Sequence, residues 1–314
     1  MQQTTNTILM IRPVSFRMNE QTAVNNYYQK DLSTSLKMTA SAVNALAQKE
    51  FDNFVLKLKE NGVEVVVIND TENPSTPDSI FPNNWISFHE NGDVALYPMF
   101  AENRRLERRE DVLEILEEKG FYIENIVDYT EAEEEDIFLE GTGSMILDRQ
   151  NSIAYCALSP RADEELFIEF CEDFEYTPVV FTSNQTVNNQ REAIYHTNVM
   201  MCVAEQFAIV CLSSIDDKKE RKNLIKQLKE SGKEIIDVTE NQINAFAGNM
   251  LQVKGIDDKR FLVMSSSAYQ SLRKDQLQKI EKHNAIIHSS LKTIETCGGG
   301  SARCMMAEVF LPKK

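Results

Sequence analysis

A single succession of elements recurs along the chain and limits the folds that this sequence can adopt. In each copy, a polar or glycine-containing turn precedes an apolar strand, a second strand, an amphipathic helix and a third strand. Five turns are marked by Asn84, Gly141, Asn198, Asn249 and Ser301, at intervals of 57, 57, 51 and 52 residues. A period of this size is typical of a repeat architecture in which each copy is one supersecondary unit.

The fifth copy lacks everything after its first strand, which begins at Ser301–Cys304. The N-terminal region contains the missing parts, namely a strand at 8–11, a helix at 36–61 and a strand at 63–68. We therefore predict an α/β fold with five units, a pseudo-symmetric five-bladed propeller closed by the N- and C-terminal segments, in one domain over residues 1–314. The other four helices are expected at 107–119, 162–174, 217–231 and 272–283.

Periodicity alone leaves a second interpretation open, a two-domain α/β protein. Its boundary would lie near Ser183–Thr186, a polar stretch that resembles a linker. The even spacing of the turns favours the single domain.

Composition narrows the classes of partner. The chain has 33 Lys and Arg against 49 Asp and Glu, a formal net charge of −16, so it has no electrostatic attraction to nucleic acid or to anionic membranes. No apolar run is long enough to span a bilayer, and the first residues lack a signal-peptide pattern. The six cysteines occur singly, without a CxxC pair, which is typical of reduced thiols. We predict a cytoplasmic protein without a metal site or a cofactor.

Three reactive side chains lie within a few residues of the turn markers: Glu140, His196 and Cys304. If the equivalent turns converge on a central axis, a thiol, an imidazole and a carboxylate face one pocket, as nucleophilic catalysis requires. Each has a structural alternative, respectively the end of an acidic surface run, a structural histidine and a buried core thiol. Their coincidence on equivalent turns favours catalysis, and the glycines at 298–300 would then bring the backbone close to a planar substrate group. The remaining histidines lie off the turns and are predicted to be surface or structural residues: His89, His283 and His288.

These residues resemble the pentein superfamily of guanidino-group-modifying enzymes, which includes arginine deiminases, dimethylarginine dimethylaminohydrolases and arginine amidinotransferases. The resemblance covers essentially the whole chain and rests on Asp78–Asn84, Leu139–Gly141, the turn at His196 and the strand at Cys304. The pattern is most similar to the arginine deiminase-related branch of citrulline-utilisation hydrolases.

The resemblance implies a role for each residue. Cys304 would attack the central carbon of a guanidino or ureido group and form a covalent intermediate. His196 would protonate the leaving amine and then activate water, while Glu140 would hold the substrate nitrogens and the histidine. Arg104 and Arg161 match positions that bind the α-carboxylate of the substrate. The resemblance implies no cofactor and a small amino acid as the partner, and it is compatible with a homodimer.

The substrate prediction rests on Asn83 and Asn84, because deiminase-like relatives usually have carboxylates here that hold a guanidinium. A neutral amide can donate to a ureido oxygen, whereas it offers a guanidinium no charge. We therefore predict hydrolysis of citrulline to ornithine, ammonia and carbon dioxide. Asp78 would still supply a charge, and arginine dihydrolases of the same superfamily also have Asn in this region. Arginine as substrate, an amidinotransferase and a non-catalytic binding protein with this fold remain the alternatives.

Overall fold

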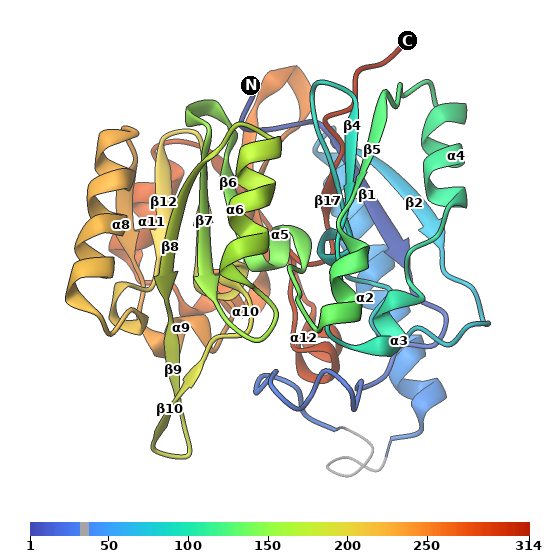
Figure 1. Ribbon diagram of the computed structural model, residues 1–314. Helices are drawn as coiled ribbons and strands as arrows, with labels where there is room; N and C mark the ends of the chain where they lie inside the picture. Colours follow the sequence, from blue (N-terminus) through green and yellow to red (C-terminus); the bar gives the residue numbers. More distant parts are fainter. Residues whose placement is uncertain (32–37) are drawn as a thin grey trace.

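Five small sheets of three strands each form the framework of the described chain, residues 1–31 and 38–314 of a computed structural model (Figure 1). In four of them, the first strand pairs antiparallel with the second, which pairs parallel with the third. Their strands, in chain order, are β3 (Ile86–Phe88), β4 (Asp93–Leu96) and β5 (Asn125–Asp128); β6 (Met145–Asp148), β7 (Ile153–Leu158) and β8 (Thr177–Thr182); β11 (Met201–Val203), β12 (Phe207–Val210) and β13 (Glu234–Asp237); β14 (Leu251–Lys254), β15 (Arg260–Ser265) and β16 (Ala285–Ser289). Each copy of the sequence repeat thus corresponds to one sheet.

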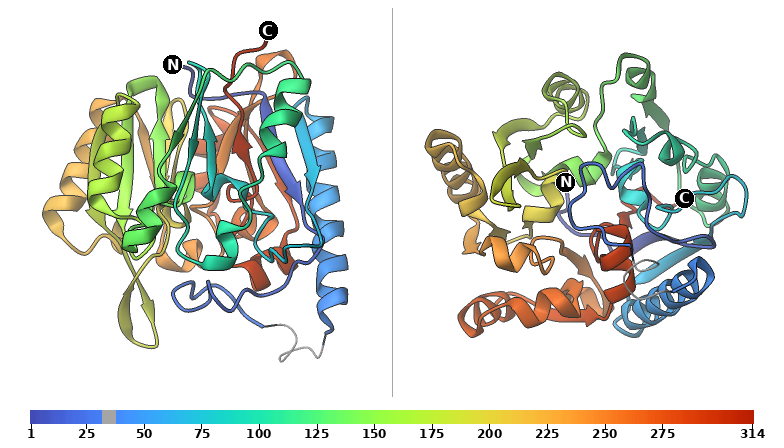
Figure 2. Two further views of the ribbon diagram at one scale, coloured as in Figure 1. Left: turned by 45° about the vertical axis from the view of Figure 1, so that its right-hand side comes forward. Right: turned by 90° about the horizontal axis from the view of Figure 1, so that it is seen from below.

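The fifth sheet combines the two ends of the chain. Strand β17 (Ala307–Glu308) pairs antiparallel with β1 (Thr7–Arg12), which pairs parallel with β2 (Glu64–Asn69). The register places Ile8 opposite both Glu308 and Val65. The prediction that N-terminal residues complete the fifth unit is therefore confirmed. Seen from below, the sheets and their helices are grouped around a central region (Figure 2).

One helix connects the parallel strands of each sheet, and these helices lie on the outside of the molecule (Figure 2). They are α2 (Ala40–Glu60), α4 (Asp111–Glu118), α6 (Glu164–Asp173), α8 (Lys218–Glu230) and α11 (Lys274–Glu281). Side-chain caps fix the starts of three of them, from Thr39, Asp163 and Asp217. The helices are close to their predicted positions. The predicted start of the first helix, at residues 36 and 37, lies outside the described residues.

Three of the other helices begin at least two residues later than predicted, and one of them, α6, begins at Glu164 because Asp163 caps it. Helix α4 begins at Asp111 because residues before it form the separate short helix α3 (Glu102–Arg105), after which Glu107 turns inward to bind Arg104. Helix α11 begins at Lys274 because α10 (Ser266–Ser271) precedes it, capped by Ser265.

The polar stretch Ser183–Thr186 is the start of a protruding hairpin (Figure 1). Strand β9 (Asn184–Val187) pairs antiparallel with β10 (Gln190–Ala193). Arg191 ties the hairpin to the body through ion pairs with Asp216 at 2.8 Å and Glu240 at 2.7 Å. The stretch is polar like a linker, but it leads into a strand, and two of its residues, Ser183 and Gln185, are buried.

Short helices lie at the inner ends of the units and carry the equivalent turns. The first three are η1 (Pro82–Asn84), α5 (Gly141–Ser144) and α7 (Thr197–Met200), and α5 contacts both of the others. Helix α12 (Lys292–Gly298) precedes the turn that contains Cys304. The remaining short helices are η2 (Thr130–Glu135), η3 (Arg149–Asn151), η4 (Leu212–Ser214), α9 (Glu240–Ile243) and η5 (Ile256–Asp258). The sequence repeat therefore brings together residues that are far apart in the chain.

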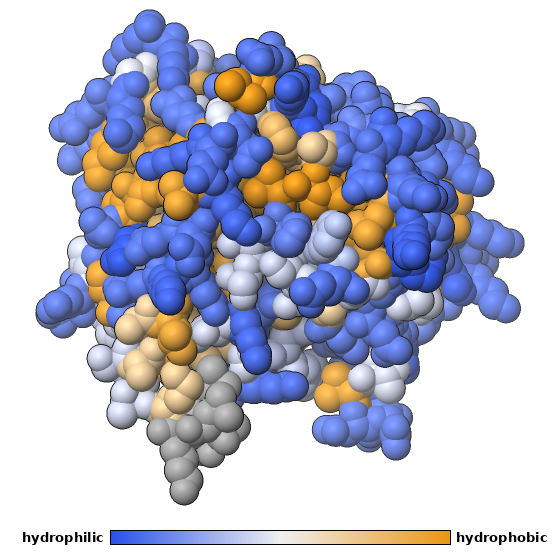
Figure 3. All heavy atoms as spheres, turned by 180° about the vertical axis from the view of Figure 1, so that it is seen from behind, coloured by the Kyte–Doolittle hydropathy of each residue, from blue (hydrophilic) through white to orange (hydrophobic). Residues whose placement is uncertain are grey.

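Apolar residues fill the space between sheets and helices. All four residues of β12 are buried, which explains its continuous apolar sequence, typical of a strand covered on both faces. Hydrophilic residues cover most of the back face, with smaller groups of hydrophobic residues between them (Figure 3). Within residues 1–31 and 38–314, none of the helices combines the length and the apolar character that crossing a bilayer requires.

Candidate active site

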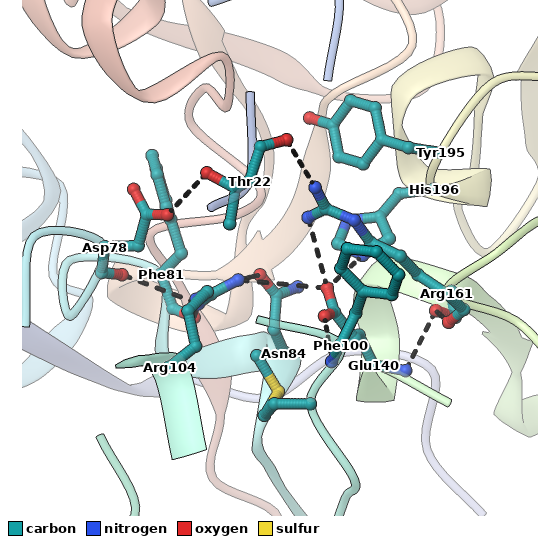
Figure 4. Close-up of polar contacts among 12 residues, drawn as sticks. Thr22, Asp78, Phe81, Asn84, Phe100, Arg104, Glu140, Arg161, Tyr195 and His196 are labelled. Atoms are coloured by element: carbon teal, nitrogen blue, oxygen red, sulfur yellow. Dashed lines mark hydrogen bonds and ion pairs between the residues drawn. The ribbon is translucent and has the colours of Figure 1, made fainter. Parts of the chain in front are cut away.

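A small buried cavity lies where the turns of different units meet (Figure 4). Six of the eight predicted site residues line it: Asp78, Asn84, Arg104, Arg161, His196 and Cys304. Glu140 lies behind His196 and Arg161 and is bonded to both. Asn83 does not line the cavity, and its amide donates to the Thr142 hydroxyl at 3.3 Å.

Glu140 is the acceptor at the centre of this polar cluster, and its side chain is fully buried. Its Oε1 accepts the N–H of Phe100 at 3.0 Å, and its Oε2 lies 2.7 Å from His196 Nε2. Burial opposes ionisation, but the charge of Arg161, the hydrogen bond from His196 and the charge of Arg104 hold the pKa of Glu140 below its ordinary value. Because the ionised carboxylate can only accept, Nε2 of His196 carries a proton and Nδ1 is left as the acceptor.

His196 is neutral at physiological pH. Burial, partly offset by Glu140, lowers the pKa of His196 to about 4. Its ring is close to Gly143, where a Cβ atom would lie 2.8 Å from His196 Nδ1 and 2.3 Å from Asn84 Nδ2. The glycine therefore leaves room for both the imidazole and the amide where a side chain would otherwise lie.

We expect titration of His196 to destabilise the protein between pH 6.5 and about 4, against the opposite contribution of the buried carboxyl group of Glu107, whose pKa burial raises to about 8. The folded-state pKa of His196 is about 4, against an ordinary value of 6.5, so the unfolded chain binds the proton more readily and acidification favours unfolding. Titration of this one group through that window costs about 3 kcal/mol of unfolding free energy. His89, buried and stacked on Phe174 at 4.0 Å, acts in the same direction because burial lowers its pKa well below the ordinary value.

Urea unfolding at pH 7, 6 and 5 tests this expectation, with His89→Gln as the comparison. Glutamine keeps a hydrogen-bonding partner for the Ser87 hydroxyl, now 2.9 Å from His89 Nε2, but does not titrate. The variant should show a shallower loss of stability in acid. A stability that falls in acid as steeply in His89→Gln as in the wild type contradicts the expectation for the buried histidines.

The Cys304 thiol is buried in the cavity wall and lies between two amides. Its Sγ is 3.1 Å from Asn249 Nδ2 and 3.4 Å from Asn198 Nδ2. Sequence reasoning used both asparagines as markers of the repeat and assigned them no chemistry. Their recurrence at the same place in successive turns was the signal that could have identified them.

The two arginines differ in what they bind. Arg104 is committed within the protein, because its guanidinium forms a two-pronged ion pair with Glu107 and donates to Asn84 Oδ1 at 2.8 Å. Arg161 instead binds the N-terminal loop, residues 13–31, which follows β1. Its guanidinium donates to the Thr22 carbonyl at 2.8 Å, and its Nε donates to Asn25 Oδ1 at 2.9 Å. Oxygen acceptors therefore occupy the face of Arg161 that would bind a carboxylate.

The N-terminal loop covers the cavity. Thr22 Oγ1 and Asn19 Nδ2 donate to Asp78 Oδ2, at 3.1 and 2.8 Å, and Gln29 Nε2 donates to the Gly298 carbonyl at 3.0 Å. The enclosed free volume is only about 10 Å³, roughly enough for one water molecule. An amino acid is larger than this free space.

The glycine triplet at 298–300 contacts this covering loop. Gly299 has a φ of 63° and packs against the Asn26 side chain, whereas Gly298 and Gly300 face the ring of Phe81. The backbone of these glycines does approach other groups closely, and in this structure those groups are protein side chains. Among the described residues, no group of three or more His, Cys, Asp or Glu side chains is arranged to hold a metal ion.

Two pocket residues retain polar atoms without a protein partner among the described residues. These atoms are Asp78 Oδ1 and Asn84 Nδ2, and both are buried. Arg104 holds Asn84 Oδ1, so the amide nitrogen is the free end of that side chain. The cavity therefore offers one carboxylate oxygen and one amide donor to a ligand.

Comparison with known proteins identifies a family. The profile of the family described as N,N dimethylarginine dimethylhydrolase, eukaryotic, matches residues 12–311. No characterised protein sequence matches the chain.

Solved structures with the same fold are distant in sequence. ArgZ, an arginine dihydrolase from the ornithine–ammonia cycle in Cyanobacteria, has a TM-score of 0.73 and 15% identity over 98% of this chain and 41% of the ArgZ chain. The isolated N-terminal domain of ArgZ bound to substrate has a TM-score of 0.68 and 16% identity, over 97% of this chain and 99% of that domain. A dimethylarginine dimethylaminohydrolase variant with an S-methyl-L-thiocitrulline adduct has a TM-score of 0.61 and 12% identity, over 96% of this chain and 98% of that one.

Proposed function

This chain belongs to the N,N dimethylarginine dimethylhydrolase family of cysteine-dependent enzymes, and we propose that it hydrolyses a carbon–nitrogen bond in a ureido or guanidino amino acid. We further propose that the five sheets form a closed pentein propeller and a single catalytic domain over residues 1–314. Cys304 and His196 line the same cavity, and His196 is hydrogen-bonded to Glu140; this arrangement supports the activity.

The reaction divides into two steps at Cys304. Its thiolate attacks the ureido carbon, and the bond to the δ-nitrogen breaks, releasing ornithine and leaving a thiocarbamate on sulfur. His196, neutral at the outset, takes up at Nδ1 the proton that the Cys304 thiol loses, passes it to the departing amine and then takes one from the attacking water. Glu140 holds the imidazole and stabilises its protonated form during transfer. Carbamate leaves and decomposes to ammonia and carbon dioxide, so one citrulline and one water are consumed.

Recognition of the amino-acid end would use Arg161 and Asp78. Arg161 is bonded to oxygen atoms of the loop that a substrate carboxylate would replace, with the same fork geometry. Asp78 has a buried Oδ1 without a protein partner, which suits an α-ammonium group. The Arg104–Glu107 pair would serve by holding Asn84.

The observation that carries the ureido assignment is the orientation of Asn84. Because Arg104 can only donate, it fixes Asn84 Oδ1 on its side and leaves the NH₂ group for the ligand. A ureido oxygen accepts from this group, whereas a guanidinium has only donors there and would leave both sides unpaired. Citrulline is therefore the proposed substrate.

A matched pair of variants tests the assignment through kcat/KM for citrulline, arginine and dimethylarginine. The wild type should prefer citrulline by at least about tenfold, the cost of one unpaired buried donor. Asn84→Asp should lose citrulline turnover and gain arginine turnover, because a carboxylate accepts from a guanidinium. Asn83→Asp adds the same charge outside the cavity lining and should keep the citrulline preference.

Arginine is the second candidate, favoured by the structural similarity to ArgZ. A wild-type preference for arginine would overturn the ureido assignment and support a dihydrolase. Absence of turnover on all three substrates by folded protein would instead support a binding protein.

A further inference from the structure

We propose that the side-chain amides of Asn249 and Asn198 donate hydrogen bonds to the Cys304 sulfur and stabilise the thiolate that attacks the substrate. This inference rests on the proposed role of Cys304 as nucleophile. Nδ2 of Asn249 lies 3.1 Å from Sγ, and Nδ2 of Asn198 lies 3.4 Å from it. Both asparagines are fully buried, so water does not compete for these donors and each N–H···S⁻ contact is stronger than in solution.

The orientation of Asn249 follows from its other partners. Its Oδ1 faces two backbone donors, the N–H of Arg303 at 3.0 Å and the N–H of Cys304 at 3.4 Å. Its Nδ2 also donates to the Asn198 carbonyl at 3.0 Å. Because a flipped amide would set donor against donor and acceptor against acceptor, the NH₂ group faces the sulfur.

Asn198 is oriented in a similar way. Its Nδ2 donates to the Thr142 carbonyl at 3.3 Å, a group that can only accept, and the same nitrogen faces the sulfur. Its Oδ1 lies 3.7 Å from Sγ and can accept the proton of the neutral thiol. Asn198 thus tolerates both protonation states, whereas Asn249 faces Sγ with a donor only and favours the anion.

Other cationic or donor groups near the sulfur are bonded elsewhere. The Arg303 guanidinium binds the Met306 carbonyl at 2.7 Å and the Glu308 carboxylate at 3.0 Å. Nε2 of His196 is bonded to Glu140, and the Tyr195 hydroxyl donates to the Gly299 carbonyl at 2.6 Å. The two amides therefore supply the hydrogen bonds that the thiolate receives from the described part of the chain.

The position of the two asparagines follows from the repeat. They occupy equivalent places in the third and fourth turns, 51 residues apart, and both amides converge on the nucleophile of the fifth turn. The repeat thus places the amide donors of two turns around a single thiol, that of Cys304.

Asn249→Asp tests the proposal with little change of shape. The carboxylate still accepts from the backbone N–H groups of Arg303 and Cys304, but it cannot donate to sulfur and adds a repelling charge. The pH dependence of Cys304 alkylation by iodoacetamide, followed by peptide mass spectrometry, should shift upward by at least about one pKa unit. Asn198→Ala should shift it in the same direction by less, because only one of two donors is lost.

Asn284→Asp is the matched control, because Asn284 is a buried amide that accepts from Gln252 at 2.7 Å and does not line the cavity. It should leave the alkylation pKa unchanged even if it lowers the Tm. An unchanged pKa in folded Asn249→Asp, or an equal shift in Asn284→Asp, would overturn the proposal.

The alkylation measurement requires no turnover, so it separates this inference from the proposed function. A shifted pKa supports the thiolate contacts even in a protein that hydrolyses none of the substrates. An unshifted pKa in a protein that hydrolyses citrulline overturns the contacts and leaves the hydrolase assignment intact.

Discussion

Cys304→Ser is expected to lower turnover by at least ~10⁴-fold while leaving the fold unchanged, because an unactivated hydroxyl cannot replace a thiolate nucleophile. The side chain sits in a buried wall and differs from serine by one atom, so packing is nearly preserved. Rapid acid quenching followed by intact-mass measurement should detect a substrate-derived adduct on the wild type and none on the variant.

The control for this experiment is a second buried thiol. Cys171 belongs to the apolar core around α6, and Cys171→Ala should keep both the turnover and the adduct at a modest cost in stability. Turnover that survives in Cys304→Ser, or an adduct mapped to another cysteine, would refute the assignment of the nucleophile.

Glu140→Gln should reduce kcat by ~10²–10⁴-fold and destabilise the protein by about 3–5 kcal/mol. The amide cannot offer His196 the charged acceptor that fixes its tautomer at 2.7 Å. The buried guanidinium of Arg161, 3.5 Å from the carboxylate, also loses a compensating charge. The effect on kcat should exceed the effect on KM, because Glu140 does not line the cavity.

Asp148→Asn separates the two effects. Asp148 forms a buried ion pair with Lys233 at 3.1 Å and takes no part in the proposed reaction. Its loss should cost comparable stability in urea unfolding, with kcat unchanged. If Glu140→Gln lowered the stability but left kcat unchanged, Glu140 would be a structural carboxylate.

The repeat made much of this architecture predictable. Turns at regular intervals placed Glu140, His196 and Cys304 in equivalent positions, and the missing strands of the fifth copy indicated the pairing of β1 with β17. Hydrophobic periodicity also located the connecting helices, because their buried faces repeat at helical spacing.

Features without periodicity were not predictable. The commitment of Arg104 to Glu107 depends on the short helix α3, which interrupts the expected helical pattern. The N-terminal loop contributes Thr22 and Asn25 to the site through contacts with residues far along the chain, and no local pattern encodes such contacts. The roles of Asp78 and Arg161 in substrate recognition remain predictions.

The sheet shared by the two chain ends has a consequence for synthesis on the ribosome. Strand β1 is translated long before its partner β17, because Ile8 pairs with Glu308. Until β17 is made, one edge of β1 stays unpaired, and the proposed nucleophile Cys304 has not been added. A partly made chain therefore exposes a strand edge that can pair wrongly, and the proposed chemistry must wait for the unit that the two segments share.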